Sequence, residues 1–497
     1  MSSIIKASLW LTLSELFFNL SGYVTHSVLG RTLGPAEYGR YGLIITVATM
    51  IVVLIGRGVP VAMSKYLGEI YKTNPSEIKH IKKISAEVQI ILISLVTLIY
   101  YFSAPFLANL LNDQTLIPLF KLSALIIPAF AAASFYVYYF TGTHQFNVQS
   151  SLKFFRGFSK IFFIILLALF FHTKGAIIGH ILAPLSVFLL AINFDWKQKR
   201  KERETIKQKT TEDSQINFTK LTHKALLNFA WPITLFMLFY EIMITIDLYM
   251  VKGLLQNDTL TGFYNASLTI GRLPFYAFYF LTIILLPKIS ETTAQKADVQ
   301  TKKIINLAMR FLFMLIIPSV TLLAIFSPSI LIFFYGNAYG EATTVLRILS
   351  IGLGFLTVFY ILAFVLNGAG KNKIPMWTAF GGMLLNAGLN YYLIPRYGIL
   401  GAGVATTITS FSTMLIAIIA TEKYISSFLN FIPVLKYFIA TAVIGIIANY
   451  LPQGKFIFIF WSIFLFVIYF IVLWLLREVK KADLEILKSA FKKNNTT

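Results

Sequence analysis

The chain has 497 residues, of which 57% are hydrophobic and 13% are charged, and its mean hydropathy is +0.73. Soluble proteins are roughly 45 to 50% apolar and about 25% charged, so this composition excludes a soluble protein and predicts a polytopic membrane protein. The net charge of +22 could suggest nucleic-acid binding, but the 43 lysines and arginines gather in alternate polar links, which is the positive-inside pattern.

The apolar stretches predict an all-α membrane protein with about 14 transmembrane helices, since a bilayer core about 30 Å thick needs roughly 20 residues per helix. The stretches are continuously apolar rather than alternating, which favours helices over a β-barrel. The placement of basic residues predicts a plasma (inner) membrane protein with both termini in the cytoplasm. The absence of cysteine excludes disulfides and thiolate metal sites. The first apolar run carries Glu15 and lacks a small-residue cleavage pattern, so we expect a retained helix and no signal peptide.

The chain divides by composition into two lobes, a linker, a peripheral helix pair and a tail. We expect the N-terminal lobe at 1–196, a basic cytoplasmic linker at 197–224, the C-terminal lobe at 225–424, two peripheral spans within 425–476, and an amphipathic cytoplasmic tail at 477–497. The spans after the second are expected near 84–108, 116–141, 155–172, 175–195, 225–251, 262–287, 304–326, 343–367, 375–395, 399–421, 432–451 and 455–476.

The first span, about Ser8 to Leu29, carries polar residues at alternating spacings of four and three. This spacing forms one face of a helix, and Glu15 and Asn19 lie on it. An outer link, Gly30 to Tyr41, leads to the second span, which carries Arg57. Arg57 lies nearer the cytoplasmic end of its span, so snorkelling to the interface is the alternative to a functional role. The stripe of the first span consists of Ser8, Thr12, Glu15, Asn19, Gly22 and His26.

The second half opens with a span that carries Glu241 and Asp247 on different faces, followed by an outer link at 252–261. The next apolar stretch, Gly262 to Pro287, has Arg272 in its middle. A charged side chain at the centre of a span costs roughly 2.5 to 3.5 kcal/mol, so such an arginine usually faces protein or a water-filled cavity. The residues expected on one polar stripe with it are Asn265, Thr269, Arg272, Tyr276 and Tyr279.

The sequence contains no metal cluster, nucleophile elbow, Walker loop or HExxH motif, and we therefore do not expect an enzyme. What remains are ionisable groups within the spans, which indicate a transport site. The alternative is that these groups pair with one another and only stabilise the bundle. Asn386 and Asn390 form a milder stripe, and asparagines of this kind often bridge helices.

Five short motifs, in this order along the chain, resemble the polysaccharide-transporter branch of the multidrug/oligosaccharidyl-lipid/polysaccharide superfamily, which includes O-antigen-type flippases for lipid-linked oligosaccharides. They are Leu33-Gly-Pro-Ala-Glu-Tyr-Gly-Arg-Tyr41, Gly262-Phe-Tyr-Asn-Ala266, Leu286-Pro-Lys-Ile-Ser290, Phe334-Tyr-Gly-Asn-Ala-Tyr339 and Leu366-Asn-Gly-Ala-Gly-Lys371. The resemblance covers the first twelve spans.

The resemblance implies two six-helix lobes around a central cavity, lined by spans one, two, seven and eight, and alternating access between leaflets. The implied substrate is an oligosaccharide on polyprenyl diphosphate, whose lipid tail stays in the membrane. Arg57 and Arg272 lie on two of the cavity-lining spans, and an arginine fork matches a diphosphate. We therefore expect substrate to contact Arg57, Arg272, Asn265, Thr269, Tyr276, Tyr279 and Asn19.

Glu15, Asp247 and Glu241 are expected to balance the arginines or to bind a coupling cation, H⁺ or Na⁺, with no other cofactor. The expected partners are the lipid-linked substrate, membrane lipids and polysaccharide-assembly enzymes, with a monomeric transport unit and no nucleic acid. A multidrug exporter and a lipid II flippase of the same superfamily are the alternatives. Drug antiporters typically have twelve spans and acidic cavities, and lipid II flippases tend to carry further arginines in the first span, where this chain has Glu15 and His26. A purely structural membrane protein would leave the polar stripes unexplained.

Overall fold

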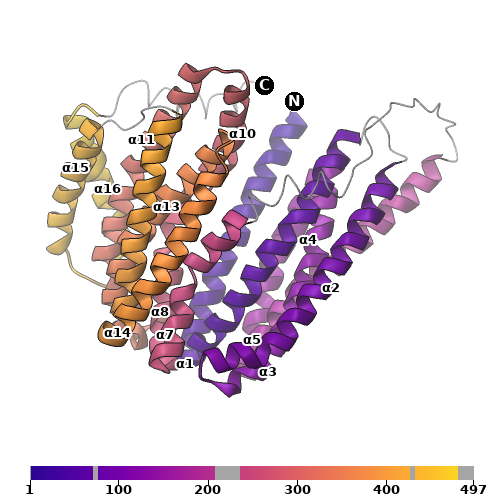
Figure 1. Cartoon of the computed structure of the whole chain (residues 1–497), viewed down its shortest axis with the longest axis horizontal. Coiled ribbons are helices and arrows are strands. Elements are labelled where there is room, and N and C mark those ends of the chain that lie inside the picture. Colours follow the sequence, from indigo (N-terminus) through magenta and orange to yellow (C-terminus); the bar gives the residue numbers. More distant parts are fainter. Residues whose placement is uncertain (1, 71–76, 207–234, 426–430, 479–497) are drawn as a thin grey trace. The chain divides into compact units, whose positions relative to one another are not determined.

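A computed structural model describes residues 2–70, 77–206, 235–425 and 431–478, and the regular structure in these ranges is helical throughout (Figure 1). The chain separates into two compact units, Met1–Thr234 and Leu235–Thr497, each with its own packed helices. Eight of the described helices are long and apolar enough to cross a membrane. The chain is therefore an all-α polytopic membrane protein, and the total of about 14 spans stays a prediction.

The N-terminal unit is built on one long helical segment, α1, which packs against α5 and α4. Residues on α4 and α5 close a core around Phe140 and Leu152, both fully buried. The elements of this unit are α1 (Ser2–Ile70), α2 (Ile78–Leu110), η2 (Gln114–Leu116), α3 (Ile117–Ser123), α4 (Ile126–Gly142) and α5 (Phe146–Ile206).

Two of these helices are too long for a single membrane crossing, and each is broken at one residue. As a continuous helix, the 69 residues of α1 would measure about 100 Å, roughly three times the thickness of a bilayer core. Gly34 interrupts α1 with φ 74° and ψ 172°, and His172 interrupts α5 with φ 51° and ψ −136°. The predicted outer link from Gly30 to Tyr41 is thus wrong in its extent, because the helix runs up to Gly34 and resumes directly after it.

The C-terminal unit begins, within the described residues, with a helical stretch at 235–243. Its central helix, α13, is buried along most of its length and packs against α14, α10 and α11. The labelled elements are α7 (Ile246–Leu255), α8 (Asp258–Gly271), α9 (Leu273–Phe278), α10 (Phe280–Ala294), α11 (Asp298–Ile325), α12 (Ser327–Tyr335), η3 (Asn337–Ala342), α13 (Thr343–Gly368), α14 (Lys373–Tyr424), α15 (Phe431–Asn449) and α16 (Ile457–Leu475).

The span that carries Arg272 differs from the predicted single helix over 262–287. It consists of α8, α9 and α10, with Arg272 between α8 and α9 and Tyr279 between α9 and α10. Pro274 explains the first interruption, because its ring nitrogen has no N–H to donate to the carbonyl of Ile270 and its ring crowds that carbonyl. The helix is therefore interrupted at Arg272.

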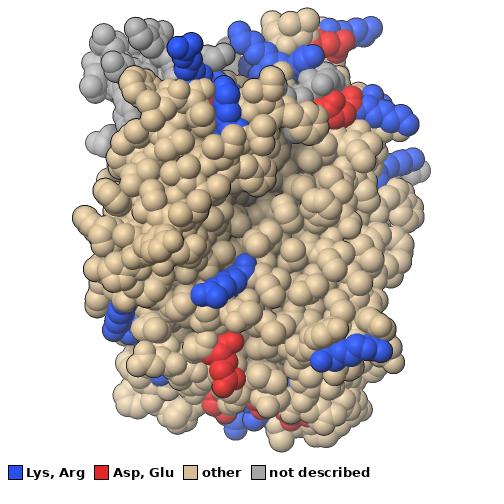
Figure 2. All heavy atoms as spheres, turned by 90° about the vertical axis from the view of Figure 1, so that its left-hand side faces the viewer, with Lys and Arg blue, Asp and Glu red and all other residues tan. Residues whose placement is uncertain are grey.

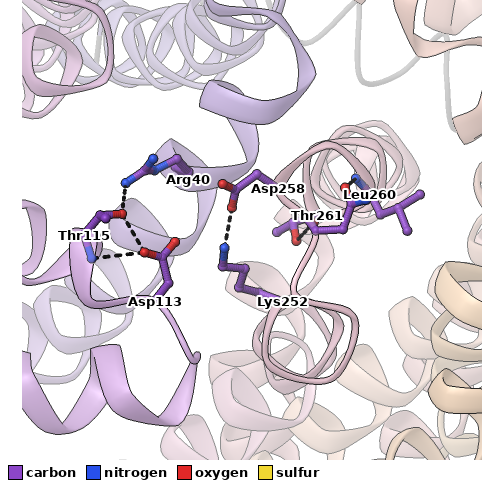
Figure 3. Close-up of polar contacts among 8 residues, drawn as sticks. Arg40, Asp113, Thr115, Lys252, Asp258, Leu260 and Thr261 are labelled. Atoms are coloured by element: carbon purple, nitrogen blue, oxygen red, sulfur yellow. Dashed lines mark hydrogen bonds and ion pairs between the residues drawn. The ribbon is translucent and has the colours of Figure 1, made fainter.

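The outer link before this span is also shorter than predicted. α7 ends at Leu255 and α8 begins at Asp258, so only Gln256 and Asn257 connect them. The Asn257 side chain accepts a hydrogen bond from the backbone N–H of Leu260 at 3.0 Å, which caps α8. Figure 3 shows the ion pair of Lys252 with Asp258 at 2.7 Å, which holds the two helix ends together across this turn.

The later spans lie where the sequence predicts them. α11 and α13 match the expected 304–326 and 343–367, and α14 contains both expected helices, separated at Gly398 with φ 59°. α15 and α16 match the expected peripheral pair, and α16 exposes large apolar side chains along its length, as a lipid-facing helix does. On the face drawn in Figure 2, a broad area carries few charged side chains, which fits a membrane-embedded surface.

Two predicted segments lie wholly or partly outside the described residues. The expected linker at 197–224 begins as helix, because α5 continues to Ile206, and the rest of it is not described. Of the tail at 477–497, only Arg477 and Glu478 are described. Glu478 is buried and lies 3.4 Å from Arg310 and 3.2 Å from Lys436, so the beginning of the tail is fixed to α11 and α15.

Candidate functional site

Asp247 is the centre of a buried polar network in the C-terminal unit. Its side chain is fully buried. One carboxylate oxygen accepts hydrogen bonds from the Tyr264 hydroxyl at 2.5 Å and the Thr406 hydroxyl at 2.8 Å. The other accepts from the backbone N–H of Leu248 at 2.8 Å. These groups come from α7, α8 and α14, so the carboxylate joins two consecutive helices to a third that is distant in sequence.

The network continues along α14 through two fully buried asparagines. Asn390 donates from Nδ2 to Oδ1 of Asn386 at 2.5 Å, and Asn386 approaches the Thr406 hydroxyl at 3.5 Å. Oδ1 of Asn390 is buried and accepts no hydrogen bond from the described residues. The sequence indicated Asn386 and Asn390 only as bridging residues and Tyr264 only as part of the motif Gly262-Phe-Tyr-Asn-Ala266, and it did not indicate Thr406.

This arrangement has the donor atoms of a cation site. A carboxylate, two amide oxygens and a hydroxyl are hard oxygen ligands, which suit H⁺ or an alkali or alkaline-earth cation rather than a soft metal. A single carboxylate balances one positive charge, which fits a monovalent cation. Oδ1 of Asn390 is buried and has no hydrogen-bond donor among the described residues. Because buried polar atoms are nearly always satisfied, this oxygen is a further feature that fits a bound cation.

Arg272 lies in the same unit, at the break between α8 and α9. Its Nη2 donates to the backbone carbonyl oxygen of Ile244 at 2.8 Å, while its Nε is buried and makes no hydrogen bond within the described part of the chain. Its electrostatic neighbours include the carboxylates of Glu241 and Asp247. The structure therefore brings together the arginine and the two C-terminal acidic residues that the sequence singled out.

The residues of the predicted polar stripe around Arg272 differ in burial and in contacts. Asn265 is buried, and the hydroxyl of Thr269 donates to the Asn265 carbonyl oxygen at 2.8 Å, within its own helix. Tyr276 is 46% exposed, whereas Tyr279 packs against Tyr360 with ring centroids 6.2 Å apart. These residues thus differ in their surroundings, and their contact with a substrate stays a prediction.

In the N-terminal unit, Glu15 forms an ion pair with Lys153 of α5 at 2.5 Å, with 48% and 28% of the two side chains exposed. Asn19 lies one turn further along α1 and is partly exposed. Arg57 lies within α1, but its side chain is outside the described residues. Within this unit, the described partner of Glu15 is thus a lysine that the sequence did not single out.

Lys153 belongs to a row of basic residues on α5 with Arg156 and Lys160. The expected span at 155–172 contains Arg156 and Lys160 but not Lys153, and none of the three was predicted as a site residue. The structure starts α5 at Phe146, so the row lies seven to fourteen residues into the helix. Spacings of three and four residues into an apolar run were the signal that could have revealed it.

Another polar cluster of the N-terminal unit lies at Arg40 of α1. Figure 3 shows Arg40 donating to the Thr115 hydroxyl, which in turn donates to Asp113 at 2.5 Å. Asp113 also caps η2 by accepting from the backbone N–H of Thr115 at 3.0 Å. These contacts fix the loop between α2 and α3 to α1, which is a structural role.

Residues 4–293 match a family model described as polysaccharide biosynthesis protein. Over 423 residues, the chain is 25% identical to the uncharacterized membrane protein MJ1375 of Methanocaldococcus jannaschii. The alignment covers 84% of this chain and 98% of that protein.

Two solved structures share the fold. A structure described as the lipid II flippase MurJ in an inward closed conformation gives a TM-score of 0.72 at 16% identity, covering 93% of this chain and 98% of that one. A multidrug resistance MATE family transporter of the MOP superfamily, in an inward-facing conformation, gives a TM-score of 0.64 at 14% identity, covering 84% of this chain and 98% of that one. The fold is thus common to a lipid flippase and a drug transporter.

Proposed function

Because the chain belongs to the polysaccharide biosynthesis protein family, we propose that it is a flippase for an oligosaccharide carried on polyprenyl diphosphate. It moves this lipid-linked substrate from the inner to the outer leaflet by alternating access. The chain is not an enzyme in this proposal, since translocation makes and breaks no covalent bond. The membrane fold shared with a lipid flippase supports the proposal.

The observation that supports the proposal most directly is the hydrogen bonding of the buried Arg272 guanidinium. A guanidinium within a membrane span is costly, yet here one edge is held by the carbonyl of Ile244 while Nε is buried without a hydrogen bond from the described residues. A diphosphate oxygen would satisfy Nε and would form charge-assisted hydrogen bonds with the fork. Arg272 is therefore the proposed anion clamp. Arg57, Asn19, Asn265, Thr269, Tyr276 and Tyr279 are the further proposed substrate contacts.

A coupling cation is the second part of the proposal. Asp247, Asn386, Asn390 and Thr406 would hold H⁺ or Na⁺, and the positive charge would neutralise the buried carboxylate. Since Asp247 is an electrostatic neighbour of Arg272, a charge bound at one group changes the free energy of binding at the other. Glu241 and Glu15 complete the proposed charge balance, Glu15 through its ion pair with Lys153.

The proposed location is the plasma (inner) membrane, with both termini in the cytoplasm and a monomeric transport unit that associates with polysaccharide-assembly enzymes. The gathering of lysines and arginines in alternate polar links motivates this orientation. Reporter fusions at Gln208 and Asn494 test it. Activity of a reporter that works only outside the cell, at either position, would reverse the orientation.

A multidrug exporter is the second candidate, because the same fold occurs in a MATE family transporter. A lipid II flippase is the third, on the same kind of likeness. The three candidates differ in cargo. The deciding experiment removes the protein from its cell and identifies which lipid-linked intermediate accumulates on the cytoplasmic leaflet. Accumulation of an oligosaccharide on polyprenyl diphosphate supports the proposal, whereas lipid II, or no lipid intermediate, would replace it.

A further inference from the structure

The helix that leads into α7 is interrupted at Ile244 and Thr245, just before Asp247. The helical stretch at 235–243 ends before these two residues, and α7 begins directly after them. In a continuous helix, the backbone N–H of Leu248 would donate to the carbonyl oxygen of Ile244, four residues back. Here this N–H donates instead to the carbonyl oxygen of Thr245 at 3.1 Å and to Oδ1 of Asp247 at 2.8 Å. The interruption therefore separates one backbone donor from one backbone acceptor.

Two charged side chains bind the two separated backbone groups. Asp247 accepts the hydrogen bond of the Leu248 N–H, and Nη2 of Arg272 donates to the carbonyl oxygen of Ile244 at 2.8 Å. A backbone group that is freed inside a membrane needs such a partner, because water is not available to it. Asp247 and Arg272 thus stabilise the interruption together, each through one of the separated groups. We refer to residues 244–248 as the α7 joint.

Thr245 also favours the interrupted form of the α7 joint. Its φ and ψ are −127° and −21°, which are not helical values. Its hydroxyl is buried and donates to the carbonyl oxygen of Glu241, four residues back, at 2.6 Å. A threonine hydroxyl that bonds to this carbonyl slightly destabilises a helix and often bends it. Thr245 therefore supports the interruption without adding a charge.

Both charged groups of the joint are groups to which the proposed ligands bind. Nε and Nη2 of Arg272 donate along the same edge of the guanidinium, and Nε has no hydrogen bond among the residues that the structure describes. A phosphate that accepts from both nitrogens competes with the carbonyl of Ile244 for Nη2. In the same way, a cation that binds Oδ1 of Asp247 competes with the N–H of Leu248. Each ligand would therefore release one of the two separated backbone groups.

We propose that the α7 joint couples anion binding at Arg272 to cation binding at Asp247. When a ligand binds to either side chain, the hydrogen bond from the Leu248 N–H to the Ile244 carbonyl forms and the helix becomes continuous. The second ligand then binds to a side chain that has already lost its backbone partner. Each ligand thus raises the affinity for the other by the same factor. The inference rests on the proposed function for its ligands, a lipid diphosphate and a monovalent cation.

The coupling is measured on the full-length protein in nanodiscs of neutral phosphatidylcholine, with a fluorescent polyprenyl diphosphate as the probe. The affinity for the probe is determined over a series of Na⁺ concentrations and of pH values. Native protein should bind the probe several fold more tightly as the concentration of Na⁺ or of protons rises, and Asp247→Asn should lose this dependence. An affinity of the native protein that is the same under all of these conditions would overturn the inference.

Substitutions of Thr245 test the joint without changing any charge. Thr245→Ala removes the hydroxyl that favours the interruption, so it should raise the affinity for the probe in the absence of the cation about twofold to tenfold. The cation should then have less effect, because the continuous form is already more populated. Thr245→Gly also removes the hydroxyl, but glycine continues a helix less readily than alanine. It should bind the probe about twofold to fivefold more weakly than Thr245→Ala.

Thr357 of α13 provides the matched control. It is buried, and its hydroxyl donates to the carbonyl oxygen of Leu353, four residues back, at 2.7 Å within a continuous helix. Thr357→Ala should leave the affinity for the probe and its dependence on the cation unchanged. Equal effects of Thr245→Ala and Thr357→Ala would overturn the inference, and so would equal affinities of the alanine and glycine variants at position 245.

The conformation of the joint can also be measured without any ligand. Because the chain has no cysteine, Leu235→Cys and Leu254→Cys introduce the two sites for spin labels, one on each side of the joint. Arg272→Ala removes a donor that stabilises the interruption, so the label distances should shift towards those of a continuous helix, in which the two Cα atoms are about 28 Å apart. Thr245→Ala should cause a shift in the same direction, and it retains the test if Arg272→Ala does not fold. No shift in any folded variant would overturn the inference.

Transport by the native protein separates this inference from the proposed function. If native protein flips a lipid-linked oligosaccharide while neither Arg272→Ala nor Thr245→Ala moves the labels, the inference fails and the proposed function stands. If both variants move the labels as expected but native protein flips no lipid-linked oligosaccharide, the hydrogen-bond exchange at the joint is supported and the proposed function fails.

Discussion

The two units each place a carboxylate next to a basic group, but they do so in different ways. Glu15 of the N-terminal unit is about half exposed and forms an ion pair with Lys153. Asp247 of the C-terminal unit is fully buried and accepts three hydrogen bonds from α7, α8 and α14. An exposed ion pair is weak and exchanges readily, whereas a buried carboxylate with three donors is fixed in position. The two carboxylates therefore differ in how firmly the structure fixes them, and substitutions at the two positions should have different effects.

The largest effect is expected from Asp247→Asn. The amide keeps the shape of the side chain, and the hydroxyls of Tyr264 and Thr406 can reorient to suit it, so the protein should fold with a loss of about 1 to 2 kcal/mol. Transport should fall at least tenfold and should lose its dependence on the coupling cation, because the charge that binds the cation is gone. Transport assays over a series of Na⁺ concentrations and pH values measure this. Native rates under all of these conditions would remove Asp247 from coupling.

Glu15→Gln should have a smaller effect on transport, a decrease of several fold. The variant loses an exposed ion pair, which contributes about 0 to 1 kcal/mol to stability, so folding should be unaffected. Transport slows because the carboxylate that balances the charge of Lys153 is lost. Initial rates at saturating substrate measure the decrease. An equal loss of transport in Glu15→Gln and Asp247→Asn would contradict the distinction between the two carboxylates.

The smallest effects on transport are expected at the residues that break the long helices, where substitutions act on stability. Gly34 has φ 74° and ψ 172°, which other residues adopt only with strain, so Gly34→Ala should destabilise the N-terminal unit by about 1 to 3 kcal/mol. His172 has φ 51°, and His172→Gly should relieve strain and leave stability unchanged or slightly raised. Thermal unfolding in detergent compares the two. A larger loss of stability for His172→Gly than for Gly34→Ala would show that the side chain of His172 contributes more to stability than relief of its backbone strain.

The helices themselves could be predicted from the sequence because each one is a local pattern. The stretch predicted at 343–367 is α13, Thr343–Gly368, and the peripheral pair α15 and α16 also lies where hydropathy indicates. The exact ends of helices depend on single residues. The turn at Gly34 needs only one non-helical residue, so the predicted twelve-residue link was too long.

The candidate site could be predicted only in part, because its contacts join distant parts of the chain. Asp247 and Arg272 could be found as charged residues within apolar stretches. Thr406, which donates to Asp247, is 159 residues away along the chain, and no local pattern marks it. The ion pair of Glu15 with Lys153 likewise joins residues 138 positions apart along the chain.

One reconstitution tests whether the chain flips a lipid-linked oligosaccharide with Arg272 as its anion clamp. Native protein, Arg272→Ala and Arg272→Lys are placed in proteoliposomes at equal folded amounts, and flipping of a fluorescent polyprenyl-diphosphate oligosaccharide is followed. Alanine should lower the affinity for substrate about tenfold to a hundredfold, and lysine should restore only part of it because it lacks the bidentate fork.

The same vesicles are tested with a cationic dye, which should not be transported. We expect flipping by native protein, partial flipping by Arg272→Lys and a large loss of flipping in Arg272→Ala. Native-like flipping by Arg272→Ala would remove this residue from the mechanism. Transport of the cationic dye by all three proteins, with no movement of the lipid-linked sugar, would contradict the proposed flippase function. The protein would then be a drug exporter.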